Sequence, residues 1–412
     1  MRISTVTVYE QSVSSMNRQQ AGFLKTGQQI ASGRRVVNPS DDPQAASRAV
    51  GVSQAMAVTE QYADARVSAR NSLAQTESVL DSASSVLERA RTLLVQASSD
   101  TLGDADRQSV ASELRGLYEV MIGQANATDG NGRYLFGGYQ DGSPPFQKDG
   151  SGNIEYNGDD NARALRIDAS RLMQVAENGE NVFLRVPGTA GHLARADEGN
   201  AGSVTFTGPS VVDATESGHR DRHRVEFAID AGGAQTYTVS RYDEATSTWA
   251  AVPGLEDLAY ESGKPVTFAG LSMAFAGDPA DGDRFELAPA QKMDPDIFRS
   301  FEQVLAALET PADTPAAKAA LRNTLNTSMR EFANAQDNVL TVRASAGARL
   351  NELDVVDSVG ANRMLNYEQT LSDLVDLDYV QATADYSLRQ VGLQASYEVF
   401  TTMKTMSLFS RM

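Results

Sequence analysis

The sequence contains no cysteine in 412 residues. Disulfide bonds, thiolate metal sites and thiol catalysis are therefore excluded. A chain without cysteine suits a protein that is transported unfolded and folds where redox conditions are not controlled. Basic residues are also scarce: 36 Lys and Arg stand against 54 Asp and Glu, which gives a net charge of −18. This balance argues against nucleic acid and against an anionic membrane surface as partners.

Long apolar runs are missing as well. No stretch approaches the roughly 20 apolar residues of a membrane-spanning helix. The N-terminal MRISTVTVYEQ lacks the basic and apolar regions of a secretory signal. We therefore predict no membrane association and no cleaved signal peptide, so that any export must use another route.

The sequence lacks recognisable catalytic motifs. GxSxG and HExxH do not occur, and the glycine-rich GNGRYLFGG has no lysine of the kind that a phosphate-binding loop needs. On a helix, His219 and His223 could hold a metal with Asp221 between them, but the surrounding HRDRHR carries three arginines that repel a cation. We predict a solvated charged turn there, and no enzyme activity, metal or cofactor for the chain.

A second weak metal signal lies in the segment from Asp149 to Glu155, with Asp160 further along. Its oxygen-bearing residues alternate as in a calcium loop. However, Ile154 stands where that loop needs glycine, and no helix precedes it. We predict a hairpin loop.

What the sequence does contain is helical periodicity. Residues 5–33 carry a mostly apolar heptad ladder spaced alternately by three and four, at Val6, Tyr9, Val13, Met16, Gln20, Phe23, Gly27 and Ile30. The other positions are mostly uncharged polar residues. Such a narrow seam indicates either a surface helix on the main domain or a segment that becomes ordered on meeting partner helices.

A longer helix is predicted from Pro43 to about Ser99, because Asp42 offers a side-chain cap and Pro43 suits the first helical position. Within it, leucines recur every seven residues, at Leu73, Leu80, Leu87 and Leu94. A matching seam follows the similar helix start Thr314-Pro315, at Leu325, Phe332, Val339 and Ala346. We predict that the two seams pack together lengthwise as the core of a helical rod.

Shorter elements are expected between these helices. A helix capped by Asp104 should run to about Ala127, and another should begin at Asp294-Pro295. Short β signals follow the first of these, at Tyr134–Phe136, Ile154–Tyr156, Leu165–Ile167 and Val182–Leu184.

Residues 187–289 lack helical periodicity and carry turn signals between short apolar runs. Six strands are predicted there, at Ser203–Thr207, Arg224–Ile229, Thr236–Arg241, Lys264–Phe268, Ser272–Ala276 and Arg284–Leu287. This pattern favours a small β-sandwich or barrel inserted between two helical halves.

The last predicted helix is apolar to its end. Its ladder comprises Leu388, Val391, Ala395, Val399, Met403 and Met406, followed by Leu408 and Phe409. Most chain ends are polar and frayed. Because one partner helix cannot hide every apolar face, we expect neighbouring subunits to cover part of this one.

Four segments carry a resemblance to a known family: SGRRVVNPSDDPQAASRA, the MRIST start, RYLFGG at Arg133–Gly138, and the C-terminal SYEVFTTMKTMSLFSRM. Together they resemble the flagellin superfamily, specifically its hook-associated branch. The resemblance covers roughly the first 185 and the last 120 residues. It implies a structural subunit at the junction between flagellar hook and filament, located outside the cell and exported without a cleaved signal through the flagellar type III apparatus.

The resemblance also implies partners. These are hook-associated protein 1 on the hook side, flagellin on the other, copies of the chain itself in a helical tube, and an export chaperone that binds the C-terminal segment. The residues expected to form the assembly interface are Val6, Val13, Met16, Phe23, Ile30, Leu388, Val391, Val399, Met403, Met406 and Phe409.

The expected fold is mostly α with an inserted β domain. We predict a long antiparallel helical rod or coiled-coil bundle with paired N- and C-terminal helices, a β-hairpin region and a projecting β-sandwich-like domain. The expected domains are a terminal assembly domain (1–42 and 371–412), a rod domain (43–186 and 290–370) and the β insert (187–289).

Two other functions stay open. A flagellin, the filament subunit itself, would share the helices, but flagellins carry alanines where this chain has Pro43-Gln44 and lack the RYLFGG segment. A secreted coiled-coil adhesin or binding module would instead work through its β insert.

Overall fold

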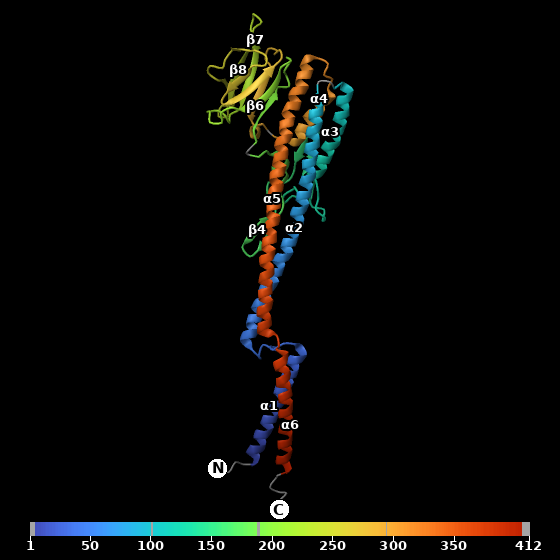
Figure 1. Cartoon of the computed structure of the whole chain (residues 1–412), viewed down its shortest axis with the longest axis vertical. Coiled ribbons are helices and arrows are strands. Elements are labelled where there is room, and N and C mark those ends of the chain that lie inside the picture. The colour runs from blue at the N-terminus through green and yellow to red at the C-terminus, as the bar shows by residue number, and fades with distance from the viewer. Residues whose placement is uncertain (1–4, 100–101, 188–189, 294, 406–412) are drawn as a thin grey trace, which may run out of the picture. The chain divides into compact units, whose positions relative to one another are not determined.

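A computed structural model of the chain describes residues 5–99, 102–187, 190–293 and 295–405 (Figure 1). The chain divides into two compact units, which we call the terminal unit (Met1–Arg66 with Asp354–Met412) and the central unit (Val67–Leu353). The α-helices are α1 (Thr5–Ser32), α2 (Pro43–Ala97), α3 (Asp104–Ala125), α4 (Ile297–Glu309), α5 (Pro315–Val375) and α6 (Tyr379–Thr405).

The two longest helices begin where the sequence predicts. Asp42 Oδ1 accepts the backbone N–H of Ala45 at 3.0 Å, and Thr314 Oγ1 accepts that of Ala317 at 3.1 Å. In each case proline occupies the first helical position, where its missing N–H costs nothing. These side chains satisfy N–H groups that the first turn leaves without a helical partner, so both predicted starts are confirmed.

The predicted cap of α3 is wrong by one residue. Gly103 is the N-cap, and Asp104 is the first residue inside the helix. Asp106 Oδ2 instead accepts the Gly103 N–H at 3.2 Å. Both aspartates lie in the first turn, where negative charge is favourable at the positive end of the helix dipole.

The helical part of the central unit has an apolar core to which α2, α3, α4 and α5 contribute side chains. Phe301 of α4 and Phe332 of α5 meet there with ring centroids 4.6 Å apart. The two seven-residue seams supply buried side chains to this cluster, at Leu80, Leu87, Leu94, Leu325, Phe332 and Val339. Leu73 is buried as well. Polar contacts join the same two helices at their surface, where Arg343 bonds Glu77 at 2.6 Å and Asp81 at 2.8 Å.

Two small hairpins follow α3. The first pairs β1 (Phe146–Lys148) with β2 (Ile154–Tyr156), and the second pairs β3 (Ala164–Asp168) with β4 (Arg171–Gln174). Asp149 Oδ1 accepts the backbone N–H groups of Ser151 and Asn153 between the first two strands. The segment that resembles a calcium loop is therefore a hairpin loop, as predicted.

Two predicted strands of this region are wrong. Tyr134–Phe136 forms a compact turn in which the Tyr134 N–H bonds Asp141 O and the Leu135 N–H bonds Ala127 O, each at 2.9 Å. Its apolar side chains, Leu135 and Phe136, are buried in the helical cluster instead of in a sheet. Burial, not strand pairing, accounts for the apolar run.

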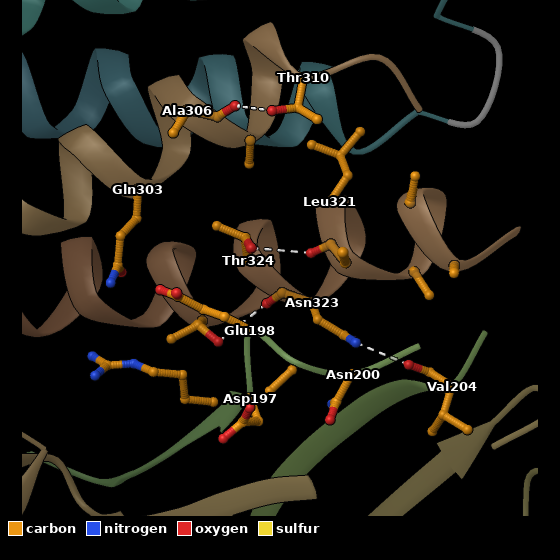
Figure 2. A pocket seen from close by; sticks show the side chains of 18 of the residues that line it. Asp197, Glu198, Asn200, Val204, Gln303, Ala306, Thr310, Leu321, Asn323 and Thr324 are labelled. Carbon is orange, nitrogen blue, oxygen red and sulfur yellow. Dashed lines mark hydrogen bonds between the residues drawn. The ribbon is translucent and has the colours of Figure 1, made fainter. Parts of the chain in front are cut away.

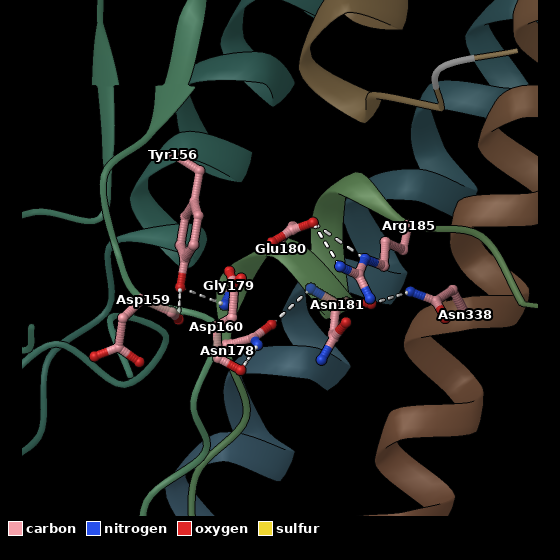
Figure 3. A network of polar contacts seen from close by, with 9 residues as sticks. All are labelled: Tyr156, Asp159, Asp160, Asn178, Gly179, Glu180, Asn181, Arg185 and Asn338. Atoms are coloured by element: carbon pink, nitrogen blue, oxygen red, sulfur yellow. Dashed lines mark hydrogen bonds and ion pairs between the residues drawn. The ribbon is translucent and has the colours of Figure 1, made fainter. Parts of the chain in front are cut away.

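The second wrong strand is Val182–Leu184, which belongs to a short π-helical turn, η1 (Glu180–Leu184). Asn338 of α5 donates from Nδ2 to the carbonyl oxygens of Asn181 and Val182 at 2.8 and 2.9 Å (Figure 3). Asn178 Oδ1 accepts the Asn181 N–H at 2.8 Å at the start of the same turn. The side chains of Asn338 and Asn178 therefore occupy backbone groups that a partner strand would use.

The β-rich domain of the central unit contains two sheets. One has the strand order β10-β8-β7-β13-β5 with β9 on β8, and the other has the order β11-β12-β6. Phe206, Phe227, Phe275 and Phe285 pack between them with centroids 5.1–6.1 Å apart. The strands are β5 (His192–Ala196), β6 (Thr205–Val211), β7 (His223–Ile229), β8 (Gln235–Asp243), β9 (Thr248–Ala251), β10 (Leu258–Ala259), β11 (Pro265–Phe268), β12 (Leu271–Ala276) and β13 (Arg284–Pro289).

Helix α5 bonds directly to this domain. Asn323 Oδ1 accepts the Phe206 N–H at 3.1 Å, and its Nδ2 donates to Val204 O at 2.9 Å. Asn326 donates to Phe206 O at 3.0 Å, and Arg330 donates to Pro209 O at 3.1 Å. These side chains satisfy backbone groups of β6 on the edge that faces away from β12.

Candidate assembly surface on the terminal helices

Helices α1 and α6 contact each other through aromatic pairs within the terminal unit. Phe23 and Tyr386 stack with ring centroids 4.6 Å apart, and Tyr9 and Phe400 meet at 5.4 Å. Both pairs join an α1 residue to an α6 residue. Aromatic pairs of this kind contribute about 0.5–1.5 kcal/mol beyond the area that they bury.

The turn after α1 is tied to the turn before α6. The Arg35 N–H donates to Val375 O at 2.8 Å, and the Leu377 N–H donates to Gly33 O at 3.0 Å. Gly33 has φ of +70°, and a Cβ placed there would lie 3.0 Å from the Tyr379 hydroxyl. Glycine therefore ends α1 in a conformation that a larger residue would strain.

Two carboxylates fix the segment between α1 and α2. Asp41 bonds Lys25 Nζ at 2.8 Å and also accepts the N–H groups of Val37 and Asn38. The hydrogen bond from Lys25 holds the pKa of Asp41 below its usual value. For Asp42, the Ala45 N–H and then the Arg35 guanidinium lower the pKa. Both groups are therefore ionised at neutral pH, where they order this segment.

The predicted interface residues of α1 are half-buried: Val13, Met16, Phe23 and Ile30. Those of α6 are exposed, because Leu388, Val391 and Val399 have 75%, 64% and 53% of their surface accessible. Val6 and Met403 belong to α1 and α6, but their side chains lie outside the described part of the chain. Met406 and Phe409 lie outside the described residues altogether.

The residues that face α1 were missed by the sequence reasoning. Tyr386 and Phe400 make the ring contacts, and Leu393 between them is half-buried. These three residues are spaced by seven, and this heptad spacing is the sequence signal that could have identified the face of α6 that contacts α1. At 100° per residue, they lie roughly opposite the face that carries Leu388 and Val391. Helix α6 therefore presents two apolar faces, of which α1 contacts one.

The central unit offers a cleft of about 340 Å³ beside α4 and α5 (Figure 2). Its walls include Asp197, Asn200 and several alanines. Its central polar side chains already have partners, since Asn323 bonds Val204 O and Thr324 bonds Ala320 O. The arrangement has no nucleophile paired with a base, so it does not support a catalytic mechanism.

The structure corrects the prediction of a solvated turn at HRDRHR. His223 begins β7 with only 2% of its surface exposed, and its ring lies 5.3 Å from that of Phe268. His219 lies in the preceding turn and is half-buried.

Over the residues that the structure describes, no group of three or more His, Cys, Asp or Glu side chains is placed to hold a metal ion. None of the described helices is long and apolar enough to cross a membrane.

Comparison with known proteins identifies relatives over the full length. The profile of the bacterial flagellin N-terminal helical region matches residues 3–141. Flagellar hook-associated protein 3 of Escherichia coli (strain K12) is 32% identical, covering 99% of each chain.

Two solved structures are also similar. The crystal structure of Xanthomonas campestris FlgL covers 78% of this chain and 99% of its own, with a TM-score of 0.66 and 30% identity. The crystal structure of the flagellar junction protein FlgL from Legionella pneumophila covers 80% of this chain and 100% of its own, with a TM-score of 0.67 and 26% identity. A mostly helical chain with a separate β-rich domain is therefore shared with these structures. By sequence and by fold, the chain belongs to the family of flagellar hook-associated protein 3.

Proposed function

We propose that this chain joins the hook of the bacterial flagellum to its filament by packing its terminal helices against those of neighbouring subunits. As a member of the hook-associated protein 3 family, the chain is a structural component of the flagellum. The flagellin alternative is not favoured, because the full-length relatives are hook-associated proteins. These relatives are structural proteins, which also suggests that the chain is not an enzyme.

The single observation that carries this mechanism is the exposed apolar row on α6. Leu388, Val391 and Val399 stand on a helix whose opposite face already contacts α1. Burying a side chain of this size contributes about 1.5–3 kcal/mol. The row is therefore a surface that assembly would bury, and we propose that helices of neighbouring subunits cover it.

The arrangement of the terminal helices is part of the proposal. Residues 1–42 and 371–412 would act as the assembly domain, with α1 and α6 working as a pair. Residues 43–186 and 290–370 would form the supporting helical domain, and 187–289 the inserted β domain. The aromatic contacts at Phe23 and Tyr9 support this pairing.

The proposed partners follow from the family. They are copies of this chain in a tubular assembly, hook-associated protein 1 on the hook side and flagellin on the filament side. An export chaperone would cover the C-terminal segment before assembly. The chain would reach its place outside the cell through the flagellar type III apparatus without a cleaved signal.

The test compares Val399→Asp with Gln390→Asp, which adds the same charge at an exposed polar position of the same helix. Both variants should melt as the parent does, because exposed substitutions rarely change stability by more than about 0.5 kcal/mol. Each is added to isolated hook structures and then flagellin is supplied, with electron microscopy as the readout. Only Val399→Asp should fail to bind hook ends and to accept a filament. Normal filaments grown on Val399→Asp would contradict the role of α6.

A test of whether the purified parent protein elongates into filaments by itself distinguishes a junction subunit from a flagellin. A salting-out agent that strengthens apolar burial is added to favour assembly. A junction subunit should bind hook ends without elongating alone. Long filaments of this chain by itself would indicate an open-ended, self-complementary filament subunit instead.

A further inference from the structure

All three histidines of the chain gather at one end of the β-rich domain. His192 begins β5 and His223 begins β7, on either side of β13 in the same sheet. His219 lies in the turn before β7, with its ring 4.7 Å from that of His192. Phe268 of β11, in the other sheet, packs on His223. The cluster therefore lies where the two sheets meet.

Burial and the contacts of His192 and His223 favour the neutral form of these two rings. His192 Nε2 lies 2.7 Å from the carbonyl oxygen of His219, which can only accept, so Nε2 carries the proton. The Nδ1 atoms of His192, His219 and His223 are buried and have no hydrogen-bond partner among the residues that the structure describes. His192 and His223 are 9% and 2% exposed. A second proton on either ring would thus be a buried donor and charge without an acceptor.

The charges around the cluster offset this cost only in part. Arg220 faces His192, and Arg241 of β8 faces His223, so both arginines oppose a further proton. Asp221 also faces His223 and favours its protonated form, but it lies 3.7 Å from the Arg241 guanidinium. Asp213, in the loop after β6, faces His219 but already accepts two hydrogen bonds from Thr215. The neighbouring strands β11 and β13 present Phe268 and the register partners Leu287 and Pro289, which are apolar.

We propose that the cluster makes the β-rich domain sensitive to protons, so that mild acid separates its two sheets at this end while the helices stay folded. Burial lowers the pKa of both His192 and His223 from the usual value. The unfolded domain therefore binds more protons than the folded one below about pH 6.5. Above that pH the two histidines do not lower the free energy of unfolding of the β-rich domain. As the pH drops from there toward the lowered pKa values of the folded state, this free energy falls. Each buried ring can change the unfolding equilibrium constant by up to about tenfold per pH unit within this window.

The chain carries a natural reporter for this domain. Trp249 is its single tryptophan, and it lies in β9 between Tyr242 and Arg224, with ring contacts to both. Denaturant titrations of the full chain at several pH values between 5 and 8 would follow Trp249 fluorescence for the β-rich domain and far-UV circular dichroism for the helices. The Trp249 midpoint should fall toward pH 5, whereas the helical transition should move much less.

Variants assign the effect to the two buried rings. In His192→Gln with His223→Phe, the amide can still donate to the His219 carbonyl and the phenyl ring can still pack on Phe268. This double variant should lose most of the pH dependence of the Trp249 midpoint. His219→Gln is the matched control, because it removes the third imidazole and keeps both His192 and His223. This variant should retain most of that dependence.

A second measurement does not require the variants to fold. Proton NMR of the parent chain resolves the titration of three histidine rings, and two of them should titrate below the usual histidine range of about 6.5. Three ordinary titrations, or a Trp249 midpoint that is the same at pH 5 and pH 8, would overturn the proposal. A pH dependence that survives unchanged in the double variant would overturn it as well.

Discussion

Phe23 of α1 and Tyr386 of α6 stack at 4.6 Å with their rings inclined by only 29°. The two residues are far apart in the sequence, so each side chain positions the other's helix. A Cβ on Gly27, one turn further along α1, would lie 3.6 Å from the Tyr386 ring. This is an ordinary van der Waals distance, so the Tyr386 ring lies against α1 at Gly27 as well as at Phe23.

The stack should couple the two helices energetically. In a double-mutant cycle of Phe23→Ala and Tyr386→Ala, the coupling should be about 0.5–1.5 kcal/mol. The free energy of unfolding of the terminal unit is measured by circular dichroism in denaturant. Leu24→Ala serves as a control beside Phe23, because Leu24 is exposed and should show no coupling to Tyr386. Additive effects of the two ring deletions would contradict the contact.

The central unit should be most sensitive at its seven-residue seams. Leu80 and Val339 are both buried in the same cluster. Leu80→Ala should lower the free energy of unfolding by about 2–5 kcal/mol, because a cavity remains in a close-packed core. Replacing both residues with Asp should leave the unit unfolded, whereas Val95→Ala at an exposed position of α2 should cost less than about 0.5 kcal/mol. Unchanged thermal melting of the double Asp variant would exclude the seam as a core.

A buried carboxylate should link the β-rich domain to the helices. Glu331 of α5 accepts bonds from Arg195 of β5 at 2.8 Å and from Ser300 of α4 at 2.7 Å. Glu331→Ala should destabilise the central unit by about 1.5–3 kcal/mol, since the buried Ser300 and the partly buried Arg195 lose a charged acceptor. Glu261→Ala, which breaks the exposed pair with Lys264, should cost at most about 1 kcal/mol. Equal melting losses for the two variants would show that burial of the Glu331 contacts does not matter.

The segment before α2 should weaken in acid. The pKa values of Asp41 and Asp42 are lowered in the folded chain, so their contribution is present above the unfolded value of 3.8 and is lost as pH falls through the folded values. Asp42→Ala should therefore lower the melting temperature of the terminal unit more at pH 7 than at pH 3. Asp42→Asn, which still caps α2, should lie between the parent and Asp42→Ala at pH 7. The same loss at both pH values would assign the whole effect to something other than charge.

Local signals predicted the helices well, because caps and periodicity lie within a few residues of each other. Asp42-Pro43 and Thr314-Pro315 each mark a helix start in the structure. Strands of the β-rich domain were also predicted, although the run at Ser203–Thr207 forms a strand that reaches Val211. The strands β5, β9 and β10 were missed. The side chains of β9 and β10 are mostly exposed and give no apolar pattern, whereas β5 buries three consecutive residues and so lacks the alternation of a half-buried strand.

The errors occur where distant residues decide the local structure. Val182–Leu184 has a strand-like composition, but Asn338 of α5 bonds the carbonyl groups of Val182 and of Asn181 just before it. Helix α6 carries two apolar ladders on roughly opposite faces, and periodicity alone could not tell which one meets α1. The sequence analysis predicts the ladder with Leu388 as the interface between subunits. That neighbouring subunits cover this ladder stays a prediction.

The hydrogen bonds from α5 to β6 affect whether this edge strand can pair with a strand of another molecule. β6 ends the three-stranded sheet, and an uncovered edge strand can pair with a strand of another chain and start aggregation. Asn323 and Asn326 occupy both backbone groups of Phe206, and Arg330 takes the carbonyl of Pro209. At Phe206 and Pro209, a foreign strand therefore finds the backbone groups of this edge already bonded. Strand pairing between copies of the chain is disfavoured at these two positions.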